Sequence, residues 1–505
     1  VKSEYDLRLL NTNQIERIEI LKGAASTLYG NAAATAVINI TTKKAKTPGV
    51  SLDIISSLGT NQSQDDQNYN FADFSNTVTL KAKHNKLSIL ASGGHQFTDG
   101  LSAAIGEETD AFSRLDGNLK IGYEFSENFS VTASAFYNKI DSEFDNGFPV
   151  QDADFSFDSE QSRFGLSSSY SYKNGSLNFN GAFNQITRSF QSSFPSAFDS
   201  ESIILDVFNK YNFSDTFYTI VGLNIIDNTT LFGDEQQTTS TDPYVNVVYV
   251  SSNGLNFNLG GRLNNHSEYG SNFIYNLNPS YTLKTSEGYL KFFGSFATSF
   301  IAPNLSQLFG PFGANPNLDP EENTTIEGGV EFRPSSKFRV SALYFNRNED
   351  GRIAFVTIDP ATFESEFQNL TEDTSFNGLE LEVQAQPVEN LNISANYTYT
   401  DGQDGLALRI PKSKINGTLG YDFSPSTFAS ISYQYVSDRD DTDFATFSPV
   451  GLEAFSLVNL YAKHEVCDTV GFFLALDNVF NTDYFEVTSF TTRGRNLRFG
   501  MELHF

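Results

Sequence analysis

Many segments of this chain alternate strictly between apolar and polar residues. In 496–505 every second side chain is apolar, beginning with Leu497. The same period of two recurs in 415–423, 391–399 and 379–386. A period of two places successive side chains on opposite faces of a β-strand. The pattern therefore predicts strands that have one apolar and one polar face.

Two kinds of connection separate these strands. Ten short turn signals lie near 84–86, 126–128, 173–176, 213–216, 252–254, 285–288, 334–337, 387–390, 424–427 and 466–469. Eleven longer polar stretches alternate with them, near 59–75, 93–113, 138–160, 188–202, 227–243, 264–275, 299–325, 346–376, 400–413, 436–453 and 480–495. Asn174-Gly175 and Asn253-Gly254 are the strongest turn signals, because both central residues of a type I′ turn need positive φ. These 21 connections predict 22 strands.

The alternation of short turns with long loops is the layout of bacterial outer-membrane β-barrels. The 459 residues of 47–505 give each of 22 strands about 21 residues, and a tilted crossing needs about 9–11. Lipid offers the backbone no hydrogen-bond partner, so every strand must pair on both edges. We therefore predict an all-β fold, a 22-stranded antiparallel transmembrane β-barrel over 47–505. The alternative is a soluble all-β repeat such as a propeller.

The composition agrees with a protein whose apolar residues face outward in a thin band. Hydrophobic residues make up 39% of the chain, yet aromatics reach 14%, with 48 Phe and no Trp. Soluble domains are usually about 45–50% apolar. No apolar run approaches the roughly 18 residues that a membrane helix needs. A barrel of this width is too wide to be filled by its own wall, so its lumen must be plugged.

Charge and motif content argue against several other functions. The chain has 33 Lys and Arg against 61 Asp and Glu, a net charge of −28, so nucleic acid is not an expected partner. Cys467 is the single cysteine, which excludes an internal disulfide and a multi-cysteine metal site. The sequence has no HExxH, GxSxG or glycine-rich phosphate loop. We therefore do not expect an enzyme, and we expect no covalent cofactor.

Residues 1–46 read differently from the strands that follow. They contain NQIERIEILKG at 13–23, AASTLYG at 24–30 and AVINITTK at 36–43. This order resembles the end of the plug domain of TonB-dependent outer-membrane receptors, although Lys22 stands where that family usually has Arg. We expect 1–46 to be the C-terminal part of a plug. The front of the plug, with the short box that contacts TonB, is expected to be missing from this sequence.

The resemblance continues through the predicted barrel. The segment SFIAPNLSQLFG from 299 is similar to a stretch of that family's barrel, and LDNVFNTDY at 476–484 and GRNLRFGMELHF at 494–505 are similar to its closing strands. The resemblance implies a multi-pass protein of the bacterial outer membrane that imports a large, scarce nutrient. In that family the TonB complex pulls on the plug to open a path, and no bond in the cargo is broken.

The resemblance also implies residues that dock the plug to the barrel. In the family, a basic plug residue pairs with two barrel glutamates, and the matching positions here are Lys22, Glu327 and Glu380. Glu380 alternates with apolar Leu379 and Leu381, so it should face the lumen. The alternative is that these are ordinary lumen-facing charges in water.

An acidic stretch bears on the cargo. The oxygen-bearing side chains of 138–160 include Asp141, Asp145, Asp152, Asp154 and Asp158. Calcium takes six to eight oxygen ligands, so this stretch is a candidate calcium site, and a solvated acidic loop is the alternative. The segment AFYNKIDSEFD at 135–145 resembles the early extracellular hairpin of cobalamin receptors, in which aspartates bind calcium. Cobalamin is therefore our first choice of cargo.

Four aromatic residues of the long loops are candidates for cargo contact, namely Phe148, Phe309, Phe312 and Phe447. They could equally hold the loops together. A ferric siderophore or haem is the alternative cargo. A passive porin and a surface adhesin or scaffold are the alternatives from other classes, and the plug remnant argues against an open porin. A surface lipoprotein that covers the barrel is a further partner that the sequence leaves open.

Overall fold

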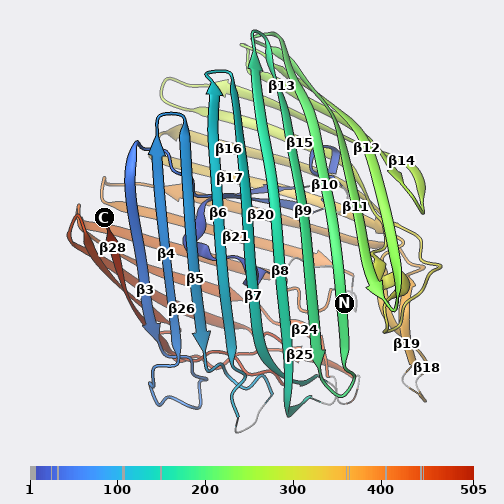
Figure 1. The fold of residues 1–505 in the computed structure, drawn as a ribbon, viewed down its shortest axis with the longest axis vertical. Helices are drawn as coiled ribbons and strands as arrows, with labels where there is room; N and C mark the ends of the chain where they lie inside the picture. The colour runs from blue at the N-terminus through green and yellow to red at the C-terminus, as the bar shows by residue number, and fades with distance from the viewer. Residues whose placement is uncertain are drawn as a thin grey trace.

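The computed structural model describes residues 7–23, 26–30, 33, 35–104, 108–147, 150–359, 361–362, 364–403, 407–443, 446 and 448–505. Its main body is a closed barrel of 22 antiparallel strands, which confirms the predicted fold class (Figure 1). No helix in these residues is long and apolar enough to cross a membrane.

The barrel strands follow one another around the wall in chain order. The first eleven are β3 (Gly49–Gly59), β4 (Asp73–His84), β5 (Leu87–Thr98), β6 (Phe112–Ser126), β7 (Phe129–Gly147), β8 (Val150–Tyr172), β9 (Gly175–Gln191), β10 (Ser196–Ser214), β11 (Phe217–Phe232), β12 (Asp234–Val250) and β13 (Leu255–His266). The others are β14 (Gly270–Lys284), β15 (Tyr289–Ile301), β16 (Glu321–Ser335), β17 (Phe338–Asp350), β20 (Thr374–Ala385), β21 (Leu391–Gly402), β22 (Ser413–Ser424), β23 (Thr427–Val436), β26 (Phe455–Cys467), β27 (Val470–Asp477) and β28 (Asn496–His504).

The barrel closes where the last strand meets the first. β28 pairs with β3, and Phe499 lies opposite Leu58. The terminal residue takes part, because Phe505 and Leu52 exchange two backbone hydrogen bonds of 2.9 Å. Closure gives every strand two neighbours, which is what the backbone requires in lipid.

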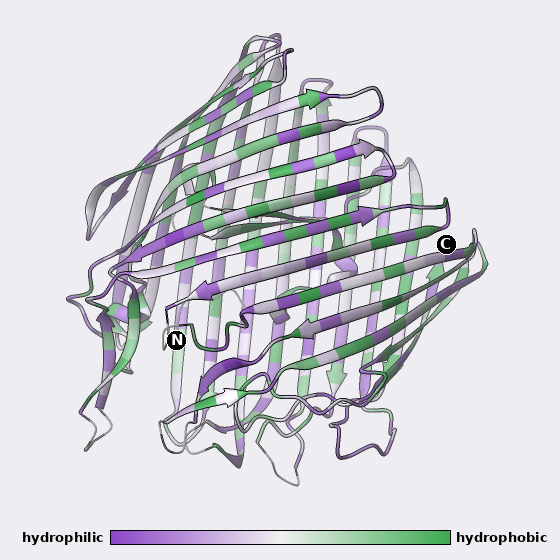
Figure 2. Cartoon of the chain, turned by 180° about the vertical axis from the view of Figure 1, so that it is seen from behind, coloured by the Kyte–Doolittle hydropathy of each residue, from purple (hydrophilic) through white to green (hydrophobic). Residues whose placement is uncertain are grey.

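Side chains alternate along the strands as the period of two predicts. Leu379 and Leu381 are exposed on the outer face, and bands of hydrophobic and hydrophilic residues alternate along the ribbons in Figure 2. The polar residues that alternate with them, Glu380 and Glu382, face the lumen, where they contact Lys22 of the N-terminal segment. The wall therefore presents apolar groups to lipid and polar groups to the plug.

Several polar stretches predicted as loops are hairpins instead. β11 and β12 are joined at Gly233, so nearly all of 227–243 is strand. In 138–160, the strands β7 and β8 pair far beyond the length needed to cross a bilayer, with Asp141 opposite Asp158. Polar residues can continue a ladder in water as well as form a loop, because the pairing needs only backbone groups. A prediction from polarity alone therefore overestimated the lengths of the loops.

Three of the remaining long connections carry small elements of their own. The stretch between β15 and β16 contains α2 (Leu305–Phe309). Two short hairpins extend from other connections, one of β18 (Ile353–Asp359) and β19 (Glu364–Asn369) and one of β24 (Arg439–Thr442) and β25 (Pro449–Leu452). Figure 1 shows the β18–β19 hairpin projecting at the end of the barrel that holds the long connections.

The N-terminal segment lies against the inner wall. It contains η1 (Leu7–Leu9), η2 (Thr12–Gln14), β1 (Ile15–Lys22), α1 (Ser26–Tyr29) and β2 (Ala36–Thr42). β1 and β2 form a separate antiparallel pair with Ile18 opposite Ile40. The predicted boundary after residue 46 falls between the end of β2 and the start of β3.

Candidate functional site

Lys22, at the end of β1, contacts the lumen face of β20. Its Nζ lies 2.5 Å from Glu382 Oε1 and also forms an ion pair with Glu380. The two glutamates are two positions apart, so the strand period places them on one face. The structure therefore brings together Lys22 and Glu380, as the sequence predicted, and adds Glu382. The sequence analysis did not include Glu382, although the alternation of charged and apolar residues in 379–386 could have indicated it.

Glu327, the third residue predicted for this site, has a different neighbour. It lies on β16 against the backbone of Gly23, where a Cβ atom would stand only 2.5 Å from Glu327 Oε2. Gly23 also has a positive φ of 80°, which side chains disfavour. The glycine thus lets the chain after Lys22 pass close to the half-buried carboxylate of Glu327. The second carboxylate in contact with Lys22 is Glu382 rather than Glu327.

The Lys22 site is suited to release. The Lys22 side chain is 44% exposed, so water can replace its carboxylate partners. Exposed ion pairs stabilise proteins by about 0–1 kcal/mol, because solvent screens them and the long side chains lose entropy. The site can position the plug without holding it strongly.

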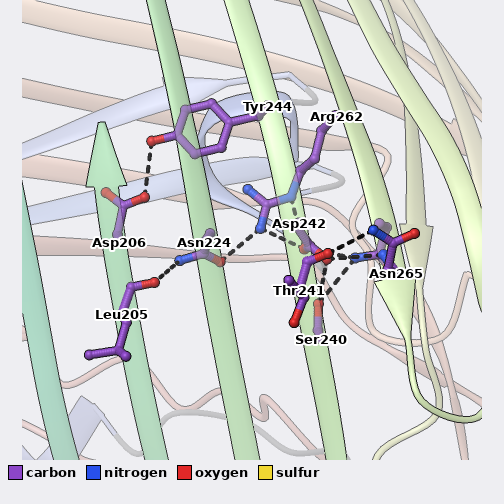
Figure 3. Close-up of polar contacts among 10 residues, drawn as sticks. Leu205, Asp206, Asn224, Ser240, Thr241, Asp242, Tyr244, Arg262 and Asn265 are labelled. Atoms are coloured by element: carbon purple, nitrogen blue, oxygen red, sulfur yellow. Dashed lines mark hydrogen bonds and ion pairs between the residues drawn. The ribbon is translucent and has the colours of Figure 1, made fainter. Parts of the chain in front are cut away.

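A second contact surface lies under α1 and was not found from the sequence. Its centre is the buried ion pair of Arg262 on β13 and Asp242 on β12, with Nη2 and Oδ2 2.7 Å apart (Figure 3). Arg262 also donates to Asn224 at 2.8 Å, and Asn264 donates to Asp242 at 2.9 Å. The Tyr244 ring lies beside the guanidinium. Both charges are fully buried and satisfied, which is the condition for tolerating them inside a protein.

The plug rests on this network through small residues. A Cβ on Gly30 would stand 3.3 Å from Arg262 Nη2, and the φ of Gly30 is +92°. Thr27 of α1 hydrogen-bonds Asn276, and a Cβ on Gly260 would stand 2.7 Å from Thr27 Oγ1. Glycines on both sides therefore allow the two backbones to approach closely. The pattern AASTLYG pointed to this segment, but nothing in the sequence pointed to its partner.

The extracellular end of the β7–β8 hairpin carries a cluster of carboxylates. Glu108, Asp110 and Asp145 offer oxygens that all lie within 4.8 Å of one another. Asp145 was predicted for a calcium site, whereas Glu108 and Asp110 come from the preceding connection. Asp145 is buried and accepts hydrogen bonds from the backbone of Ala104 at 2.5 Å and Ala153 at 2.9 Å. These bonds fix the carboxylate in place.

The electrostatics of this cluster resist full ionisation. Burial, and then the neighbouring Asp145, raise the pKa of Asp110 to about 6. A hydrogen bond with Asp154, followed by burial and by Asp152, raises the pKa of Glu108 to about 7. Carboxylates that share a site repel one another when charged, and a cation would relieve that repulsion.

The other predicted calcium ligands divide into two groups. Asp152 and Asp154 interact with Glu108 and so lie beside the cluster. Asp141 and Asp158 face each other across β7 and β8, and Asp141 pairs with Lys139 at 2.9 Å. The structure therefore brings Asp145, Asp152 and Asp154 together and places Asp141 and Asp158 on the hairpin stem.

Two of the four loop aromatics lie in described residues. Phe309 ends α2 and is 36% exposed, and Phe312 follows it and is 49% exposed. The neighbouring Leu308 belongs instead to a small apolar core with Leu318, Ile353 and Phe367. Phe148 and Phe447 lie outside the described residues. The sequence prediction did not include Phe355 of β18, which is exposed beside Phe367 with ring centroids 5.0 Å apart.

A protein-family model described as the TonB dependent receptor-like β-barrel matches residues 51–479. The chain belongs to the TonB-dependent receptor family. A second model, the TonB-dependent receptor plug domain, matches residues 1–37. The protein is therefore an outer-membrane receptor and transporter, as the sequence predicted, and the elements from η1 to β2 lie mostly within the match to the plug.

Curated and solved proteins agree with this family. The vitamin B12 transporter BtuB of Photobacterium profundum is 25% identical over 498 residues, covering 95% of this chain and 78% of that protein. The siderophore receptor PirA of Pseudomonas aeruginosa superposes with a TM-score of 0.80 at 20% identity, covering all of this chain and 89% of that one. The FrpB iron transporter of Neisseria meningitidis superposes with a TM-score of 0.82 at 15% identity, covering 98% of this chain and 88% of that one. The solved structures share the fold.

We predict that replacing Glu380 and Glu382 with Gln loosens the plug only modestly. The substitutions remove the two carboxylates that pair with the solvent-exposed Lys22. The plug should lose about 1 kcal/mol of binding free energy or less, which is equivalent to a change of about fivefold in rate at most. Protease cleavage within the plug of the full-length receptor should accelerate to that extent. Glu465→Gln, which removes an exposed charge beside Lys463, is the control. Acceleration of a hundredfold would show that the Lys22 site is a principal anchor.

We expect Asp242→Asn to lower the free energy of unfolding much more. It leaves the buried Arg262 without a neutralising partner, which typically destabilises by about 3–5 kcal/mol. Denaturant unfolding in detergent measures the change. Glu124→Gln is the contrast, because Glu124 forms an exposed pair with Lys83, and should cost under about 1 kcal/mol. If both substitutions lowered the free energy of unfolding by the same small amount, burial of the Asp242–Arg262 pair would not be what makes it stabilising.

Proposed function

We propose that this receptor imports a cobalamin and that calcium orders the extracellular end of its β7–β8 hairpin. The carboxylate cluster of Glu108, Asp110 and Asp145 is the observation that carries the proposal. The similarity to a curated vitamin B12 transporter supports the cargo. The cargo would cross without any bond being broken, so the protein acts as a transporter and not as an enzyme.

The donor set suits calcium chemically. All the groups are carboxylates, the hard oxygen ligands that calcium prefers. Asp110 Oδ1 and Asp152 Oδ1 are buried and have no hydrogen-bond partner among the described residues. Glu108, Asp110 and Asp145 would hold the ion, with Asp152 and Asp154 close by. The ion would supply positive charge that offsets carboxylate repulsion and ties the connection before β6 to the hairpin.

The remaining residues would bind the cargo and hold the plug. Phe309 and Phe312 are exposed in the connection that contains α2 and could pack against a near-neutral, partly apolar corrinoid. The net charge of −28 is unfavourable for capturing an anionic ferric siderophore. After binding, the TonB complex would displace the plug, and the exposed Lys22 site would open readily.

A ferric siderophore or haem is the alternative cargo. The solved structures with this fold include proteins named as siderophore receptors and an iron transporter. Their identities of 20% and 15% support the shared architecture and not a shared ligand.

Equilibrium dialysis of the full-length receptor against cyanocobalamin tests both parts of the proposal. We expect tight binding in calcium that weakens at least tenfold in a chelator. Asp110→Asn with Asp145→Asn should bind weakly in either buffer, whereas Asp438→Asn, which changes an exposed acid of another loop, should resemble the wild type. Protons compete for carboxylates of raised pKa, so the calcium effect should shrink as the pH falls from 7.5 to 5.5.

The other outcomes separate the two parts. Tight binding that ignores calcium would retain cobalamin as cargo and reject the calcium site. Absence of cyanocobalamin binding in both buffers would reject cobalamin and favour a ferric siderophore or haem.

A further inference from the structure

The plug segment that precedes β1 is held by strand β6. β6 and β20, which carries the Lys22 partners, are separated around the wall by eleven strands in one direction and nine in the other. The two strands therefore stand on opposite sides of the lumen. We propose that Arg114 and Asp116 of β6 form a second plug-docking site, the Asp116 site, which retains the plug more firmly than the Lys22 site does.

Asp116 binds two plug amides with its two oxygens. Asn11 Nδ2 donates to Asp116 Oδ1 at 3.0 Å, and Gln14 Nε2 donates to Asp116 Oδ2 at 2.6 Å. Asn11 also donates to Thr77 Oγ1 at 3.2 Å, and its own oxygen caps η2 by accepting from the backbone of Asn13. One plug side chain thus links the fold of its own segment to the barrel wall.

Arg114 binds the plug backbone rather than a side chain. Its Nη1 donates to the carbonyl oxygens of Arg8 at 2.8 Å and Leu10 at 3.0 Å. Arg114 and Asp116 are two positions apart on β6, and their charged groups approach to 3.6 Å. The pair therefore presents a donor and an acceptor to the plug side by side, and each finds its complement in the segment 8–14.

Apolar packing continues the contact toward the extracellular end. Leu9 of the plug is buried against Ile140 of β7 and Phe157 of β8. The partly buried rings of Phe112, Phe144 and Phe190 surround this cluster. Burial of apolar area beside the polar contacts excludes water from them and strengthens them.

Shape also fits the contact to the plug. A Cβ on Gly94 of β5 would stand 2.7 Å from Asp116 Oδ1, so a larger residue there would occupy the space of the Asn11 amide. The absence of a side chain at Gly94 is what allows Asn11 to reach the carboxylate.

Burial distinguishes this site from the Lys22 site. Asp116 is 4% exposed, Asn11 6% and Arg114 9%, whereas the Lys22 side chain is 44% exposed. When a buried charged group loses its partner, no water replaces it, so separation costs far more than at an exposed pair.

The order of the segments along the chain decides which docking site a pulling force reaches first. Residues 8–14 precede Lys22, so a force applied ahead of residue 8 reaches the Asp116 site before the Lys22 site. The Asp116 site thereby sets the threshold for moving this part of the plug. The inference concerns plug retention and does not depend on which nutrient is carried.

The first test compares Asp116→Asn with Asp227→Asn in the full-length receptor. Asp227 is a matched control, because it accepts only from Gln237 and Thr239 of the wall in the contacts of the described residues. The rate of protease cleavage within the plug should rise at least tenfold for Asp116→Asn and stay within twofold for Asp227→Asn. Heat-modifiable migration on a gel shows that the barrel is folded. A rate within twofold of the wild type for Asp116→Asn would overturn the proposal.

A rescue variant separates docking from a role in the wall. Asn11→Asp combined with Asp116→Asn exchanges the carboxylate and the amide across the contact. The cleavage rate should return to within threefold of the wild-type rate. Asn11→Asp alone places two carboxylates against each other, and its cleavage rate should be at least tenfold above that of the wild type. A double variant as fast as Asp116→Asn would assign the effect to the wall and overturn the proposal.

A plug variant covers the case in which Asp116→Asn does not fold. Asn11→Leu leaves the barrel sequence intact and removes the amide that binds Asp116. It should raise the plug cleavage rate at least tenfold and lengthen the open events seen in a planar bilayer. An unchanged rate and unchanged conductance in this variant would also overturn the proposal.

Discussion

The hydrogen-bonding demand of the backbone in lipid determines the rest of this structure. Every strand must pair on both edges, so 22 strands close into one wall. A wall of that circumference leaves a lumen that its own side chains cannot fill. The plug that fills it must be held by polar groups, because the inner faces of the strands are polar. Whether those groups are exposed or buried then decides how firmly each part of the plug is held.

The same demand explains which features could be predicted from sequence. Strand number followed from the period of two and from ten turns with glycine, proline, asparagine or aspartate signals, because both reflect local backbone geometry. Lys22 and Glu380 were found through a resemblance, and the strand period would have added Glu382. The lengths of the extracellular hairpins were misjudged, since polar residues suit a ladder in water as well as a loop. Asp242 with Arg262, and Glu108 with Asp145, lie on different elements, so only the three-dimensional register brings them together.

Glycine recurs where the plug meets the wall, and each instance has a neighbour that explains it. Gly23 lies against Glu327, Gly30 against Arg262, and Gly94 beside Asp116. In each case a carboxylate or guanidinium occupies the volume that a side chain would need. The plug surface is thus shaped around fixed charges of the barrel, which places polar groups of the plug at hydrogen-bonding distance without burying an unpaired charge.

The seam between β28 and β3 has a consequence for biogenesis. Leu52, in the first barrel strand, is bonded to Phe505, the last residue of the chain. The contact with the greatest sequence separation in the wall is therefore the one that completes it, and contacts of this kind form slowly because the intervening chain must first be ordered. Until the final strand arrives, the wall is an open sheet with two unpaired edges. The segment 7–42, which precedes the wall in the chain, can be enclosed only when β28 pairs with β3.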